Sequence, residues 1–103
     1  MKAKTNLTML CDFYELTMAN GYFQTGLKDR ICYFDVFYRS VPDKAGFALA
    51  AGLAQVVEYI QELHFDEEDL DYLRSKGCFC EEFLDFLRTF RFTGDIWAVP
   101  EGT

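Results

Sequence analysis

Residues 11–18, Cys-Asp-Phe-Tyr-Glu-Leu-Thr-Met, constrain the fold most, because they carry the signature of a helix start. Asp12 is a good N-cap residue, since its carboxylate can accept a hydrogen bond from a free N–H group of the first turn. Glu15, three residues later, completes an acidic variant of the capping box. Apolar side chains then recur at helical spacing, at Leu16, Ala19 and Phe23. The pattern predicts a helix that begins after Asp12, buries one face and ends near Gly26, a suitable C′ residue.

Tyr14 lies off that apolar face, in the first turn of the predicted helix. An aromatic ring beside free N–H groups, at the positive end of the helix dipole, can hold a flat anion. The alternative is a half-buried tyrosine that serves only the core, and spacing alone favours this plainer interpretation. The residues by themselves leave both roles of Tyr14 open.

Residues 31–39 predict a strand, because they are rich in aromatic and β-branched side chains. Alternate positions make one wholly apolar face, formed by Cys32, Phe34, Val36 and Tyr38. Arg39 ends the opposite face, and Pro42 stops the strand. Arg39 either pairs with Asp35 on its own face or binds an anion where the strand opens into a loop.

Three more helices are predicted, over residues 53–63, from residue 66 to about 76, and over 81–90, followed by a turn and a strand at 92–100. The acidic run at 66–69 suits the first turn of a helix, where negative charge is favourable. Leu70 and Leu73 of that helix are expected to face inward. Helices and two strands together predict an α/β (α+β) fold, in which helices pack on a small, incomplete sheet. The 103 residues fit one domain at most, and we expect residues 1–103 to be an incomplete portion of one.

Aromatic side chains are abundant, with eleven Phe and six Tyr. Because each aromatic ring buries a large area, either the core is dense or much of the surface meets a partner. No run approaches the roughly 18–20 apolar residues of a membrane span, which predicts no membrane partner. The polar residues 1–6 lead into no apolar signal segment, so we expect a cytoplasmic protein.

The net charge of −7 is concentrated in the second part of the chain. Residues 62–103 hold eleven acids and four bases, whereas residues 1–61 hold six of each. This acidity argues against nucleic acid as a partner. The four cysteines, Cys11, Cys32, Cys78 and Cys80, are expected to be free thiols. Their spacing, with His64 as the single histidine, predicts no metal site.

Residues 12–18 closely resemble the Asp-Leu-Tyr-Gln-Leu-Thr-Met signature of the nicotinate phosphoribosyltransferases. The resemblance continues in order through residues 21–23 (Gly-Tyr-Phe), 34–39 (Phe-Asp-Val-Phe-Tyr-Arg), 46–53 (Gly-Phe-Ala-Leu-Ala-Ala-Gly-Leu) and 99–103 (Val-Pro-Glu-Gly-Thr). It covers nearly the whole chain. Cys11, Phe13 and Glu15 depart from the threonine, leucine and glutamine that are common in the family, but Asp12, Tyr14 and Arg39 match it.

This resemblance implies a fold and a reaction. The fold would be the N-terminal region of a type II phosphoribosyltransferase, beside an irregular α/β barrel that this chain lacks. The reaction would join nicotinate and phosphoribosyl pyrophosphate into nicotinate mononucleotide and pyrophosphate, in NAD salvage, with Mg²⁺ and ATP as cofactors of the full-length enzyme. Members are several times longer, so the chain resembles an N-terminal piece that is inactive alone. No catalytic residue is expected in it, and His64 is not the histidine that family members phosphorylate.

The resemblance also implies roles for three substrate-binding residues. Tyr14 would stack on the pyridine ring, reaching into the neighbouring site of a homodimer. Arg39 would lie near the phosphates, and Asp12 would support the first turn of the helix. Two alternatives remain at this stage, a fragment of a nicotinamide phosphoribosyltransferase-like enzyme and a non-catalytic interaction module.

Overall fold

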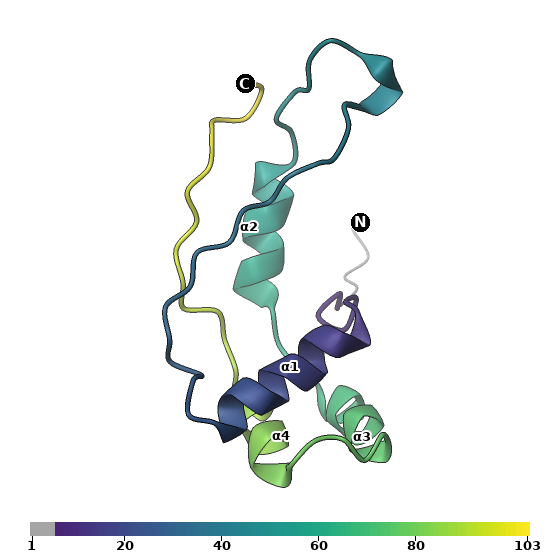
Figure 1. Cartoon of the computed structure of the whole chain (residues 1–103), viewed down its shortest axis with the longest axis vertical. Helices are drawn as coiled ribbons and strands as arrows, with labels where there is room; N and C mark the ends of the chain where they lie inside the picture. Colours follow the sequence, from purple (N-terminus) through teal and green to yellow (C-terminus); the bar gives the residue numbers. More distant parts are fainter. Residues whose placement is uncertain (1–5) are drawn as a thin grey trace.

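The computed structural model describes residues 6–103, so the predicted polar start of the chain, residues 1–5, lies outside the described residues. The described part contains helices α1 (Phe13–Gln24), α2 (Leu53–Glu62), α3 (Glu67–Ser75) and α4 (Glu81–Arg88), and the 3-10 turn η1 (Pro42–Lys44). Figure 1 shows α1, α3 and α4 gathered at one end, while α2 and two long irregular segments run toward the other end.

The core lies where α3 and α4 pack together and α1 packs against α4. Its fully or nearly buried members are all apolar: Leu70, Leu73, Phe83, Leu84 and Leu87. The predicted inner face of α1 packs against this cluster through Leu16, Ala19 and Phe23. The sequence-based expectation that α1 buries that face, and that Leu70 and Leu73 of α3 point inward, is confirmed.

Helix α1 begins at Phe13 as predicted, with Asp12 at the N-cap. The predicted capping box is wrong, however, because the Asp12 side chain makes no capping bond. Instead the Glu15 N–H donates to the backbone oxygen of Asp12 at 3.1 Å. At the other end Gly26 takes the left-handed conformation (φ 79°), and Leu27 N–H donates to Tyr22 O at 2.8 Å. This Schellman ending confirms Gly26 as the residue that stops the helix.

Two arginine forks join α3 to α4. Arg74, in the last turn of α3, binds Glu81 in the first turn of α4 with a 2.7 Å Nε–Oε1 contact. Arg88, in the last turn of α4, reaches back to Glu67 in the first turn of α3. Each arginine also contacts an aspartate three residues before it in its own helix. Glu67 and Glu81 therefore link the two helices through the arginines, while the two aspartates pair within their own helices.

The predicted strands are not formed: within residues 6–103 neither 31–39 nor 92–100 belongs to a strand. Both segments run along the long axis of the molecule as irregular chain (Figure 1). A strand exists only when a neighbouring strand satisfies its backbone N–H and C=O groups, and no described segment does so here. The prediction of a small sheet is therefore wrong for the described residues, whose fold is helical.

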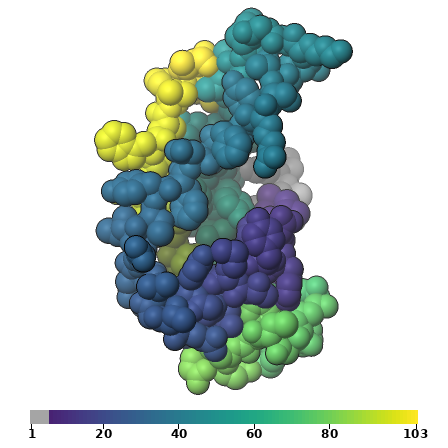
Figure 2. Space-filling view, in the orientation of Figure 1, coloured from purple at the N-terminus to yellow at the C-terminus, as the bar shows by residue number. Residues whose placement is uncertain are grey.

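These irregular segments leave the molecule open. Its radius of gyration is 16.5 Å, against roughly 13 Å for a compact domain of this length. Its accessible surface is 8821 Å², where a compact chain of this size exposes roughly 6,000 Å². Figure 2 shows side chains of the first irregular segment and of the C-terminal segment standing away from the helical body. Among the described residues, no helix has the length and apolar character needed to cross a membrane.

The C-terminal residues are tied to the start of α2. Gly102 N–H donates to Ala50 O at 2.7 Å, and Ala50 N–H donates to Thr103 O at 2.8 Å. The Glu101 carboxylate accepts hydrogen bonds from the N–H groups of Gly52 (3.0 Å) and Leu53 (3.4 Å). Glu101 is thus an N-cap for α2 supplied from 48 residues away, a role that local patterns did not predict.

Candidate functional site

The first turn of α1 presents Tyr14 to solvent. Its side chain keeps 60% of its surface exposed, whereas Phe13 beside it turns toward Phe79, with ring centroids 5.7 Å apart. Thr17 Oγ1 donates to the backbone oxygen of Tyr14 at 3.0 Å, which reinforces the turn. The described residues therefore leave most of the Tyr14 ring in solvent, on the side of α1 that faces away from the core.

The surroundings of this turn are negatively charged. Burial and the carboxylates of Glu15 and Asp12 raise the pKa of the Cys11 thiol. Burial, together with Cys11 and Glu15, likewise raises the pKa of Tyr59 on α2. The two carboxylates offset the positive end of the helix dipole. The turn can therefore offer the Tyr14 ring for stacking, but it does not provide a positively charged site for an anion. A positive partner for an anion would have to come from elsewhere.

Asp12 and Arg39 are both exposed. Asp12 adjoins Tyr14 at the start of α1. Arg39 precedes η1, which Figure 1 shows at the upper end of the molecule, away from α1. Within residues 6–103 Arg39 has no ion pair with Asp35, and the salt bridge weighed from the sequence is not formed. The structure brings Asp12 to Tyr14 but does not bring Arg39 to either.

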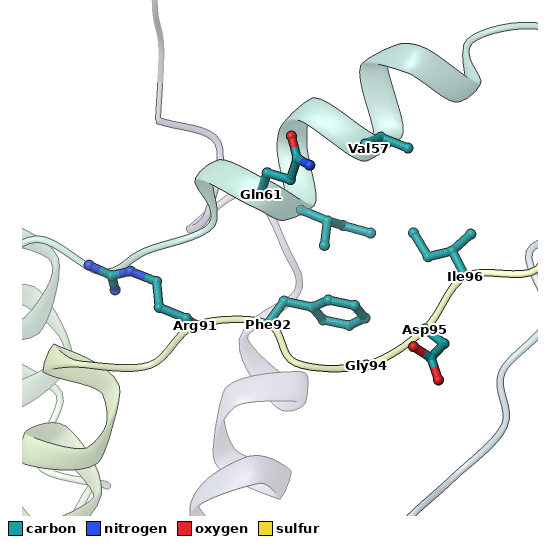
Figure 3. A pocket seen from close by; sticks show the side chains of 8 residues that line it. Val57, Gln61, Arg91, Phe92, Gly94, Asp95 and Ile96 are labelled. Carbon is teal, nitrogen blue, oxygen red and sulfur yellow. The ribbon is translucent and has the colours of Figure 1, made fainter.

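A hollow of about 500 Å³ lies between α2 and residues 91–96, and it was not predicted from the sequence. Its floor is apolar, formed by Val57, Ile60, Phe92 and Ile96, with Gln61, Arg91 and Asp95 at its edges (Figure 3). The ring of Phe92 lies so close to Gly94 that an added Cβ would come within 2.8 Å of it. The alternation of Phe92, Gly94 and Ile96 is the only sequence signal for this surface.

The thiols and acids do not assemble into a metal centre. In the part of the chain that the structure describes, no group of three or more His, Cys, Asp or Glu side chains could hold a metal ion. All four cysteines are free, with Cys80 half-buried and the other three exposed. His64 contacts Asp66 at 3.1 Å and Glu62 O at 2.6 Å, at the junction of α2 and α3, and its backbone N–H donates to Thr8 Oγ1 at 3.1 Å.

Residues 9–103 match the family model of the nicotinate phosphoribosyltransferase N-terminal domain. This match covers almost the whole chain, and the chain belongs to that family, as the resemblance of residues 12–18 predicted. A Mycobacterium tuberculosis protein named nicotinate phosphoribosyltransferase pncB2 is 46% identical over 95 residues, which are 92% of this chain and 20% of that protein.

More distant relatives carry the same name. The nicotinate phosphoribosyltransferase of Bacillus subtilis is 33% identical over 97 residues, covering 94% of this chain and 20% of the relative. That of Caenorhabditis elegans is 34% identical over 100 residues, covering 92% of this chain and 17% of the relative. The chain therefore spans about a fifth of the length of these curated relatives.

Proposed function

We propose that this chain serves as the N-terminal domain of an enzyme that joins nicotinate and phosphoribosyl pyrophosphate into nicotinate mononucleotide and pyrophosphate. The observation that carries the proposal is the family match over residues 9–103, with 46% identity to a protein named for nicotinate. ATP-coupled NAD salvage in the cytoplasm, by a homodimer, is the accompanying expectation from the family. The names of the relatives favour nicotinate over nicotinamide as the pyridine substrate.

Tyr14 is the residue of this chain that we assign to the pyridine ring. Its exposed position on the first turn of a packed helix supports stacking against a flat ring that approaches from outside, as from a neighbouring subunit. The negative surroundings of that turn imply that the nicotinate carboxylate is bound by cations outside it. Arg39, exposed before η1, is free to approach the phosphates of the second substrate.

The contribution of this chain to the chemistry is positioning. Dissociative glycosyl transfer needs the ring nitrogen aligned with the carbon that pyrophosphate leaves, and a stacked Tyr14 restricts the ring to one plane. The described residues offer no donor set for Mg²⁺, so no step is assigned to the metal here. Asp12 supports the arrangement indirectly, because its backbone oxygen receives the Glu15 N–H and so begins the helix.

The test compares the complete gene product that carries this chain with the isolated 103 residues. We expect the complete product to form nicotinate mononucleotide from nicotinate and phosphoribosyl pyrophosphate, with little use of nicotinamide. We expect none from the isolated chain, since it supplies positioning alone. Preference of the complete product for nicotinamide would refute the assigned substrate, and product formation by the isolated chain would refute the positioning role.

A further inference from the structure

The loop between α3 and α4, residues 78–80 (Cys-Phe-Cys), receives a directed contact from α1. Asn20 is one of two buried polar residues of the described chain. Its Nδ2 donates to Cys78 O at 3.3 Å, and its Oδ1 accepts from Cys80 N–H at 3.3 Å. The side-chain amide therefore binds the backbone on both sides of Phe79, in the way that a neighbouring strand would.

The residue between these two bonds makes a second contact with α1. The Phe79 ring meets Phe13 edge-on, with 5.7 Å between centroids and 76° between planes. On its other side Phe79 stacks on Phe83, with centroids 5.9 Å apart. Phe83 is 1% exposed and belongs to the core. The Phe79 ring therefore connects the core to Phe13, the first residue of α1.

The two contacts are spaced to fix the orientation of α1. Phe13 and Asn20 are seven residues apart, which places them two turns apart on one helix face. Leu16, Ala19 and Phe23 pack on the core as apolar surfaces, and such surfaces specify direction weakly. The paired hydrogen bonds of Asn20 do specify direction, because a small rotation of α1 about its axis would break them.

We propose that residues 78–80 are a positioning element for Tyr14, holding α1 at the rotation that directs the Tyr14 ring outward. Tyr14 follows Phe13 directly, so the Phe13–Phe79 contact sets the direction in which the next side chain leaves the helix. The proposal rests on the stacking role of Tyr14 assigned above. It gives Asn20 and Phe79 a role that requires no contact with substrate.

The kinetic test uses Asn20→Ala and Phe79→Leu in the complete gene product. We expect each to raise the KM for nicotinate roughly tenfold while kcat changes less than twofold, since a misdirected ring binds the substrate poorly. Phe79→Tyr, which keeps the ring, should retain the original KM. The matched control is Phe90→Leu, which removes ring contacts with Phe86 and Phe65 in the same cluster but leaves residues 78–80 untouched. It should lower the melting temperature and leave KM unchanged.

A second measurement reads the ring itself in the complete gene product. With 3-fluorotyrosine in place of tyrosine, the ¹⁹F signal that disappears in Tyr14→Phe belongs to Tyr14. We expect Asn20→Ala and Phe79→Leu to shift or broaden that signal and Phe90→Leu to leave it in place. An unchanged Tyr14 signal in both loop variants would overturn the positioning role.

The two measurements separate this inference from the proposed function. If Tyr14→Ala raises the KM for nicotinate but neither loop variant does, the positioning role fails and the stacking role stands. If Tyr14→Ala leaves KM unchanged, the stacking role fails, and the fluorine signal alone then decides whether residues 78–80 orient the ring.

Discussion

The helical end of the molecule and its irregular segments use similar side chains in opposite ways. In the helical end, built by α1, α3 and α4, phenylalanines form a continuous series of ring contacts and the leucines of α3 and α4 are buried. In residues 31–38 an equally apolar sequence lies in solvent, with Phe34 90% exposed. Apolar composition alone therefore does not determine burial. An apolar segment is buried only where nearby residues of the chain provide its hydrogen-bonding and packing partners.

The helical end folds because its hydrogen-bonding partners lie close in the sequence. Helices satisfy their own backbone groups, so α3 and α4 need only each other and α1 to bury their apolar faces. The irregular segments need strand neighbours that the described residues do not provide. Single positions that make long-range bonds, such as Glu101 to α2, are the exception in that half.

The largest expected contrast comes from truncating one phenylalanine in each region. Phe83→Ala removes a ring that is 1% exposed, and we expect it to lower the free energy of unfolding by about 3–5 kcal/mol. Phe34→Ala removes a solvent-exposed ring and should change that free energy by less than about 0.5 kcal/mol. Urea unfolding followed by far-ultraviolet circular dichroism measures both. Equal losses would mean that the exposed segment packs in solution and would abolish the comparison.

The second contrast assigns one substrate to each region in the complete gene product. Tyr14→Ala should raise the KM for nicotinate ten- to hundredfold, because a stacking contact worth about 1–3 kcal/mol is lost. Tyr14→Phe should cost less, since the aromatic face remains. Arg39→Ala should instead raise the KM for phosphoribosyl pyrophosphate, through a lost charge-assisted bond. Steady-state kinetics with a thermal melt decides the matter: a destabilised Tyr14→Ala enzyme with an unchanged KM for nicotinate would leave Tyr14 a structural role only.

The same division explains what could be foreseen from the sequence. The helices, their inward leucines and the Gly26 stop follow from periodicity and end signals within a few residues. The predicted strands are absent from the described residues. The composition of residues 31–39 and 92–100 shows that they can pair in a sheet, but it does not show whether a neighbouring strand is present. The predicted capping box failed for a smaller reason: the exposed Asp12 side chain makes no capping bond, and its backbone oxygen receives the Glu15 N–H instead.

The candidate site divides in the same way. Tyr14 is predicted because it stands at a recognisable helix start and within the family motif, and its role in binding stays a prediction. Asn20 was missed, although a polar residue on the face of Leu16 and Phe23 is the signal that a buried partner exists. Glu101 gave no local signal at all, because its partners lie 48 and 49 residues earlier in the chain.

A smaller effect is expected where the C-terminal residues are anchored to the start of α2. Glu101→Ala removes the carboxylate that accepts from Gly52 and Leu53, and we expect a loss of about 1 kcal/mol. Hydrogen exchange should localise this loss to the amides of Gly52 and Leu53. Glu62→Ala, at the opposite end of α2, is the matched control and should leave the exchange of those two amides unchanged. Equal protection in Glu101→Ala and the original chain would show that Glu101 does not cap α2.

The smallest effect concerns the arginine forks of the helical end and their dependence on pH. Arg88 lowers the pKa of Glu67, and Arg74 lowers that of Glu81, in each case chiefly by hydrogen bonding to the carboxylate. A carboxyl group with a lowered folded-state pKa binds protons more weakly when folded, so its stabilisation is present above the ordinary glutamate value of 4.5 and is lost as the pH falls through the folded value. We therefore expect the melting temperature to fall below pH 4.5 by more in the original chain than in the Glu67→Gln/Glu81→Gln double variant. Both carboxylates are exposed, so the difference should be small and should shrink further in about 0.5 M salt. Melting curves that fall in parallel for the two proteins between pH 6 and pH 3 would show that the forks add nothing to the stability of the helical end.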